Sequence, residues 1–550
     1  MLRCVQRIRS AGGIWSLLLV FGFGLLVGCG ENVRFNNPLA EKSAKQAAPK
    51  RQAAPPETAP PKKTDDKEAQ ARRAMIRTTS MRGGGGGSTF SSSGNTTTSN
   101  ASVADNLGRL RREIESSVDF APTMIVWMVD ATPSAAELRG EWADAAKRLY
   151  SDFATNGLPG GKPAEQLSTA IVAFGEKPQF VLEQPTTDFA LVGTKLGEIP
   201  TDESGKETTF ATVSQLLEKY GPLKSQQSRE LLLVVVSDEA GDDLAQVDAA
   251  IAKANSTGVR VYGIGVPAPL GRKMAEVPAM ETRSDGQPAM VQGPETRYSQ
   301  HPDMKFSYGG FGGDDIDSGY GPFGLTYLAY KTRGAFLVSR LRNASWPGNA
   351  MRFEDSVMLS YPPQYLSEQE YQAKLQENKA LAALHRAAQQ PQVEAMSYPG
   401  SQFQTGDEAR LKNALDRAQR TSARLGPLID VIYEPLAEGE KDRAKITDKR
   451  WQASYDLALG RAAAIKARID GYNQMLAILK GGRTFQDPSH DTWILEPADT
   501  LEEAGSRLER LRLQAKEYLQ RVIDEHPGTP WAYLAERELE SPIGWKWVEG

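Results

Sequence analysis

Cysteine and histidine are scarce in this chain of 550 residues. It has two cysteines, Cys4 and Cys29, and four scattered histidines. None of the histidines has the H-E-x-x-H spacing with which a helix presents two imidazoles to zinc. A surplus of basic charge is also missing, since 65 lysines and arginines face 69 aspartates and glutamates. These scarcities argue against a histidine-dependent hydrolase and against a nucleic-acid-binding protein.

Nucleotide-binding and hydrolase signatures are missing as well. Gly205-Lys206 lacks the hydroxyl residue and the earlier glycine of a phosphate-binding loop, and Gly263-Ile264-Gly265 lacks the third glycine of a dinucleotide fingerprint. The sequence has no G-x-S-x-G nucleophile elbow. We therefore expect a protein that is not an enzyme, and a hydrolase with an unrecognised site remains the alternative.

The first 29 residues have the parts of a bacterial export signal. Three arginines precede an apolar stretch over residues 14–27, and Leu26-Val27-Gly28-Cys29 then resembles a lipobox. The resemblance implies cleavage after Gly28 and acylation of Cys29, with palmitate among the expected chains. The apolar stretch is shorter than the ~20 residues of a spanning helix, which disfavours an uncleaved membrane segment. Several acyl chains would anchor the protein stably in the cell envelope, outside the cytoplasm.

The residue after the cysteine bears on which membrane holds the anchor. In some bacteria an aspartate at that position marks retention in the inner membrane, and this chain has Gly30. The glycine favours the outer membrane and a periplasmic or other extracytoplasmic location. Because Cys4 would leave with the signal, the exported chain would have no free thiol and no disulfide.

Residues 30–101 are rich in Ala, Pro, Lys, Gly, Ser and Thr. Apolar residues are too sparse there to offset the entropy of ordering the chain, so we expect a disordered linker. A flexible chain of this length reaches on the order of 50 Å. The linker would hold the folded part clear of the membrane.

From residue 102 to about 345 the pattern alternates between strands and helices. Residues 124–129 and 231–236 are continuous apolar runs, as strands buried on both faces are, and amphipathic stretches such as 135–154, 210–220 and 244–254 read as helices. This alternation predicts an α/β fold with a doubly wound, mostly parallel sheet. Ligands bind such sheets at the carboxyl ends of the strands.

Polar residues follow the apolar strands in three loops. Asp130-Ala131-Thr132-Pro133-Ser134 comes after the first run, Thr208 and Thr209 open a helix, and Asp238 follows the run at 231–236. The order of these loops resembles von Willebrand factor type A domains, in which D-x-[ST]-x-S, a threonine and an aspartate form a metal-ion-dependent adhesion site. The resemblance covers residues 121–266 and resumes over residues 319–338, where it implies a closing helix and edge strand.

The resemblance implies a magnesium site with protein-docking activity. Thr132, Ser134 and Thr208 or Thr209 would supply hydroxyl ligands, and Asp130 and Asp238 would bind the ion directly or through water. Mg²⁺ prefers six oxygen ligands, and few carboxylates leave it under-neutralised. A Glu or Asp of a partner protein would then take the open position. Mn²⁺ and Ca²⁺ are alternatives to Mg²⁺.

Each candidate ligand also has an ordinary structural interpretation. Ser134 begins a capping-box pattern, Thr208 or Thr209 suits a helix N-cap, and Asp238 suits a turn. Glu239 stands where the family commonly has glycine, and Thr132 where it usually has serine. These departures leave open a degenerate site in a structural envelope protein.

Two further regions complete the chain. Residues 267–318 interrupt the family pattern, and an Asp285-Gly286 turn predicts a hairpin within this insertion. Residues 346–550 predict an all-α domain with a long apolar stripe from Trp451 to Leu479. Residues 515–535 weakly resemble one tetratricopeptide unit, with Thr529 as the N-cap of its next helix. We expect this domain to offer a second interaction surface.

Overall fold

The computed structural model describes residues 97–272, 274–276, 290–304, 316–342, 351–391, 393 and 400–550. The expected signal peptide with Cys29, most of the expected linker, and the Asp285-Gly286 turn lie outside these residues. Within the described ranges, no helix combines the length and the apolar character needed to cross a membrane.

A seven-stranded sheet forms the core of the α/β domain. Its strands run parallel except for the last, which pairs antiparallel with its neighbour. In spatial order they are β1 (Thr97–Ser102), β9 (Phe336–Arg340), β6 (Arg260–Gly265), β5 (Glu230–Val236), β2 (Thr123–Asp130), β3 (Leu167–Phe174) and β4 (Gln179–Thr186). The first and third candidate loops follow β2 and β5, which are adjacent and central, and the second precedes α5 (Thr209–Gln226).

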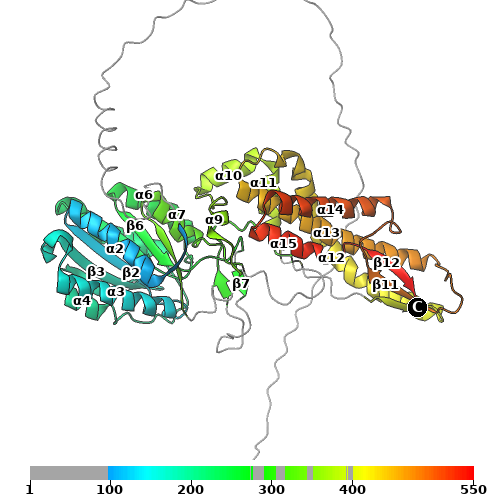
Figure 1. The fold of residues 1–550 in the computed structure, drawn as a ribbon, viewed down its shortest axis with the longest axis horizontal. Coiled ribbons are helices and arrows are strands. Elements are labelled where there is room, and N and C mark those ends of the chain that lie inside the picture. Colours follow the sequence, from blue (N-terminus) through cyan, green and yellow to red (C-terminus); the bar gives the residue numbers. More distant parts are fainter. Residues whose placement is uncertain are drawn as a thin grey trace, which may run out of the picture. The chain divides into compact units, whose positions relative to one another are not determined.

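Helices cover both faces of this sheet because its central strands are apolar on both faces. Ile125, Trp127 and Val129 of β2 pack beneath α2 (Val103–Phe120), α3 (Ala136–Asn156) and α4 (Phe189–Lys195). The alternate residues of β2 pack beneath α5 (Thr209–Gln226), α6 (Val247–Thr257) and α7 (Phe323–Lys331). Short 3-10 turns, η1 (Pro159–Gly161), η2 (Ala164–Gln166) and η3 (Leu244–Gln246), join the elements. The layers are visible in Figure 1, and they confirm the doubly wound α/β prediction.

The structure departs from the prediction at both edges of the sheet. Strand β1 occupies residues 97–102, nearly all of which fall within the predicted linker, and it pairs with β9. The closing strand β9 is therefore an inner strand, and the expectation of an edge strand there was wrong. Strand β4 and helix α4, at the other side, had no counterpart in the prediction.

The C-terminal region is helical, as predicted. Its helices are α9 (Asp355–Met358), α10 (Glu368–Glu377), α11 (Lys379–Ala388), α12 (Glu408–Arg443), α13 (Lys449–Lys480), α14 (Ser506–Glu525) and α15 (Pro530–Leu539). Helix α13 carries the Trp451 to Leu479 stripe, and from Arg450 to Tyr472 it is buried on nearly all sides rather than on one. Thr529 caps α15 through its side chain, as expected.

This region also holds a small antiparallel sheet, so it is not purely α-helical. The sheet consists of β10 (Gln402–Gln404), β11 (Thr492–Pro497) and β12 (Trp545–Glu549). The indole nitrogen of Trp545 donates to the main-chain oxygen of Arg468 at 2.9 Å. The aromatic C-terminal strand thus docks on the central helix α13.

The insertion packs against the helical region. Its strands β7 (Met274–Glu276) and β8 (Met290–Gln292) pair antiparallel, whereas the Asp285-Gly286 turn on which the hairpin prediction was based is not among the described residues. Leu270 and Met304 are buried in the hydrophobic core of the helical region. Glu295 forms an ion pair with Arg450 of α13, and both side chains are buried. The insertion therefore links the α/β domain to the helices.

Candidate metal centre

Asp130 ends strand β2 and lies buried at the carboxyl end of the sheet. One of its carboxylate oxygens accepts from the main-chain N–H of Thr132 at 2.9 Å and from the hydroxyl of Thr132 at 2.6 Å. The other accepts from the Ser237 hydroxyl, at the end of β5, at 2.7 Å. The two central strands are therefore joined through the Asp130 carboxylate.

The hydroxyls of the first loop continue from this carboxylate toward solvent. The Thr132 and Ser134 hydroxyl oxygens are 3.0 Å apart, and the Ser134 side chain is exposed. Ser134 also forms a hydrogen bond with the Asp238 carboxyl, although burial still holds the pKa of Asp238 well above its usual range. Helix α3 has Ala135 as its N-cap and no side-chain cap bond, so the capping interpretation of Ser134 was wrong. The structure thus brings four predicted residues together.

The threonines of the second loop take different positions. Thr208 stands at the N-cap position of α5 but makes no side-chain cap bond. Its hydroxyl donates to the main-chain oxygens of Gly175 and Glu176 at 3.0 and 3.1 Å, which fixes the loop to the end of β3. The Thr209 hydroxyl is buried without a hydrogen-bond partner. Of the two, Thr209 has the hydroxyl that is still available to an ion.

Glu207 is a site residue that the sequence did not reveal. Its side chain is only 5% exposed, and one carboxyl oxygen lies 3.3 Å from the Thr132 hydroxyl. The other carboxyl oxygen is buried without a partner. Its place directly before the paired threonines was the one available signal, and that signal does not distinguish a buried acid from a solvated one.

The third loop supports the second from the opposite side. Glu207 and Asp242 exchange two hydrogen bonds, from the Glu207 N–H to the Asp242 carboxylate and from the Asp242 N–H to the Glu207 carbonyl, both at 2.9 Å. The Asp243 carboxylate accepts the N–H groups of Phe210 and Ala211 at 3.0 and 2.7 Å, which caps α5 from outside the helix. Asp242 and Asp243 therefore hold the two loops in register.

The acidic side chains at this edge are close enough to oppose one another's ionisation. Burial, followed by the Asp130 charge, raises the pKa of Glu207 to about 10. Burial and the charges of Asp130 and Glu239 raise the pKa of Asp238 well above its usual range, and burial and Asp130 raise that of Glu239 to about 7. Burial also raises the pKa of Asp130. Buried acids that repel one another are stabilised by a cation.

The residues at this edge fit a hard divalent cation. An oxygen of Asp238 and one of Glu207 are buried without hydrogen-bond partners, and unsatisfied carboxylate oxygens are costly unless a charge compensates them. Carboxylate and hydroxyl oxygens are the ligands that Mg²⁺ and Ca²⁺ prefer. Arg139 donates two hydrogen bonds here, both at 2.9 Å, to the main-chain oxygens of Asp130 and Thr132. Neither of these bonds is to a carboxylate, so they do not neutralise the acidic side chains directly.

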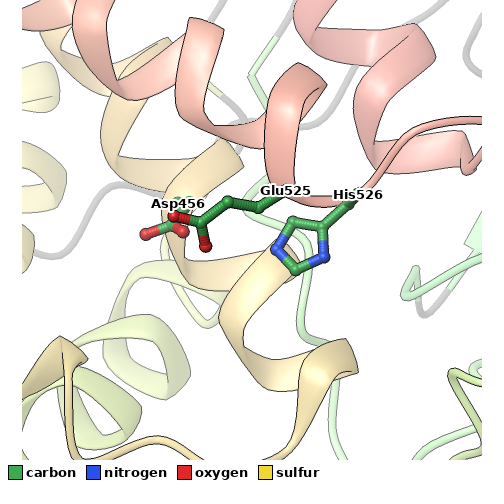
Figure 2. A group of neighbouring side chains, drawn as sticks. All are labelled: Asp456, Glu525 and His526. Atoms are coloured by element: carbon green, nitrogen blue, oxygen red, sulfur yellow. The ribbon is translucent and has the colours of Figure 1, made fainter.

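A second acidic group lies among the C-terminal helices. Asp456 of α13, Glu525 at the end of α14 and His526 directly after it have ligand-type atoms within 4.8 Å of one another, and Figure 2 shows their side chains converging. Both carboxylates are already paired. Arg443 donates to Asp456 and Glu525, and Arg521 donates to Asp456 at 2.6 Å.

Arginine pairing makes this second group a poor cation site. Two guanidinium charges offset the two carboxylates, and the buried His526 ring has its pKa lowered to about 4, chiefly by burial. We interpret the group as an ion-pair network that fastens α12, α13 and α14 together.

Comparison with known proteins gives only low-scoring structural matches. No family model and no curated protein matches the chain. Among solved structures, it is similar to the conserved hypothetical protein BatB from Bacteroides thetaiotaomicron, with 15% identity, 41% of this chain and 95% of that chain covered, and a TM-score of 0.27. An aerotolerance-related membrane protein from Bacteroides fragilis gives 15% identity, the same coverage and a TM-score of 0.25.

A pilus protein gives a shorter match. For three N-terminal domains of the type V pili tip protein Mfa5 from Porphyromonas gingivalis, identity is 16%, coverage is 22% of this chain and 20% of that chain, and the TM-score is 0.18. Scores of this size carry no argument about function. The fold assignment therefore rests on the strand order and the helix layers of the chain itself.

Proposed function

We propose that this chain is an envelope-anchored protein that docks a partner protein through a divalent cation. The cation, Mg²⁺ in the first instance and Mn²⁺ or Ca²⁺ as alternatives, would be held where β2 and β5 end. Asp130, Thr132, Ser134 and Asp238 would hold it, with the Thr209 hydroxyl beside them. The lipid anchor expected at Cys29 would keep the protein at the membrane. The role is binding rather than catalysis.

One observation carries the proposal. Acidic side chains from three loops converge at the carboxyl end of the central strands, and the buried oxygens of Glu207 and Asp238 lack partners. Such an arrangement opposes folding unless a cation compensates it. The exposure of Ser134, the outermost residue of the cluster, supports access from solvent on one side. A bound ion could therefore present a coordination position to another molecule, and the resemblance to adhesion domains supports an acidic side chain as its ligand.

The first test is binding of the metal alone. Isothermal titration calorimetry of the full chain in detergent with Mg²⁺, Mn²⁺ and Ca²⁺ should show a site in the wild type that Asp130→Ala removes. Asp144→Ala is the matched control, because Asp144 is an exposed acid on the neighbouring helix α3. Equal titrations for all three proteins would rule out the metal site.

The second test is docking. Partner capture from envelope extracts should be lost on adding EDTA and in Asp130→Ala, and kept in Asp144→Ala. Capture that neither change affects would favour the alternative of a structural envelope protein with a degenerate site.

A further inference from the structure

The position of Glu207 is fixed by main-chain bonds rather than by its own side chain. Its N–H and carbonyl both pair with Asp242, and Thr208, the next residue, is held against the end of β3. The Glu207 side chain therefore extends between the loops toward the Thr132 hydroxyl, where one oxygen lies 3.3 Å away. The loop framework presents a carboxylate to the candidate cation from within the chain.

The charged groups around the Glu207 carboxylate disfavour its ionised form. Asp130, Asp238, Glu239 and Asp242 all act on Glu207 as repulsive charges. Its second oxygen is buried and has no hydrogen-bond partner. A buried, unpartnered carboxylate surrounded by like charges is the arrangement that a directly bound cation stabilises.

We propose that Glu207 is an internal ligand of the cation and occupies the coordination position that an acidic side chain of a partner would otherwise take. The inference rests on the proposed function and adds a regulatory step to it. With Asp130, Glu207 and Asp238 all bound to one divalent ion, the site has a net negative charge and repels an external carboxylate. Docking of an acidic partner then requires the Glu207 carboxylate to withdraw from the ion.

If Glu207 is a ligand, its removal should change the affinity for the cation and the affinity of the bound cation for a carboxylate in opposite directions. A glutamate with a purely structural role would not have this effect. Removing Glu207 should weaken binding of the cation, because a ligand is lost. Loss of an outer-shell partner of a metal ligand typically costs about 10- to 100-fold in affinity, and a direct ligand should cost no less. The same removal should strengthen binding of a small carboxylate to the cation, because a position is vacated and a repelling charge is gone.

Terbium luminescence measures both quantities on the full chain in detergent. Decay rates in H₂O and D₂O give the number of water molecules on bound Tb³⁺, and acetate serves as the carboxylate probe. We expect Glu207→Ala to bind Tb³⁺ at least about tenfold more weakly, to carry more water on the ion, and to lose that water as acetate is added. The wild type should lose less water in acetate than Glu207→Ala, because its Glu207 carboxylate already fills one position on the ion and offsets one of its charges. Glu203→Ala, an exposed glutamate of the same loop, should behave as the wild type.

The outcomes distinguish the inference from the function on which it rests. No Tb³⁺ or Mg²⁺ binding in the wild type would overturn the proposed function together with the inference. Binding with the same hydration and acetate response in wild type and Glu207→Ala would overturn the inference alone. Glu207→Gln preserves the shape of the side chain and replaces Glu207→Ala if circular dichroism shows that the alanine variant is unfolded. Its expected effects are the same in direction, because the amide is a weaker ligand and carries no charge.

Discussion

Replacing Glu538 with glutamine should strongly destabilise the helical region. Glu538 of α15 pairs with Arg461 and Arg468 of α13, and all three side chains are only 1% exposed. Arg468 would keep hydrogen bonds to the main-chain oxygens of Pro542 and Ser541 at 3.0 and 2.9 Å. The loss is therefore chiefly one of charge compensation, since two buried guanidinium groups lose their shared carboxylate. Breaking a buried ion pair from one side costs about 3 to 5 kcal/mol, and two stranded cations place this case at the upper end.

Urea unfolding of the full chain, followed by tryptophan fluorescence, measures this free energy. Glu536→Gln on the exposed side of the same helix makes the identical chemical change and should stay within about 0.5 kcal/mol of the wild type. A loss for Glu538→Gln under about 1 kcal/mol would refute the reasoning.

The destabilisation by Glu538→Gln should depend on pH. Burial raises the pKa of Glu538, but the two arginines lower it by more, so its pKa in the folded chain lies below the unfolded value. The stability it contributes is present above the unfolded pKa of 4.5 and is lost as the pH falls through the folded value. The difference in unfolding free energy between wild type and Glu538→Gln should therefore shrink in acid. A difference that does not change with pH would contradict this account.

Three further predictions concern the candidate site and α14. A divalent cation at about 100 times its dissociation constant should add about 2.7 kcal/mol to the stability of the α/β domain. In differential scanning fluorimetry this is a rise of roughly 5 to 11 °C in Tm, and Asp130→Ala should abolish the rise. Gly241→Ala should lower the free energy of unfolding by at least about 1 to 2 kcal/mol, because Gly241 has φ +83° and an added Cβ would lie 2.5 Å from the Thr209 hydroxyl. An unchanged urea unfolding curve would contradict this prediction. Because burial lowers the pKa of His526 from 6.5 to about 4, protonation of the unfolded chain should reduce stability as the pH falls from 6.5 toward 4, and His526→Gln should flatten that limb in urea titrations.

The central part of the fold was predictable because burial there leaves a simple pattern. Strands β2 and β5 are apolar at almost every position, and their ends carry the polar loop residues. Residues 97–102 of β1 read Thr-Thr-Ser-Asn-Ala-Ser, which resembles the polar linker before them. Strand β4 lies at the sheet edge and is largely exposed, so it lacks a buried strand's apolar run. Edge strands are specified by pairing with a neighbour, which a local pattern does not encode.

The candidate site was predictable in its first loop and less so in its second. Asp130, Thr132 and Ser134 are fixed by a strand end and a short turn, so their spacing in the sequence is their spacing in space. Which of Glu207, Thr208 and Thr209 faces the site depends on how the second loop aligns with Asp242 and Asp243 of the third. That alignment joins residues more than 30 positions apart. A pattern read along the chain therefore selected two threonines and missed the glutamate.

Strand β1 has a mechanical consequence if the chain is anchored through Cys29. Because β1, β9, β6, β5 and β2 are all parallel, the tether enters at the amino end of the sheet while Asp130 faces the opposite, carboxyl end. A pulling force between the membrane and a docked partner would then act along the strands. It would load the hydrogen bonds between β1 and β9 in shear, so that these bonds share the force instead of breaking one after another. Residues 97–102, the least strand-like part of the sheet in sequence, would be the first paired segment to bear the load.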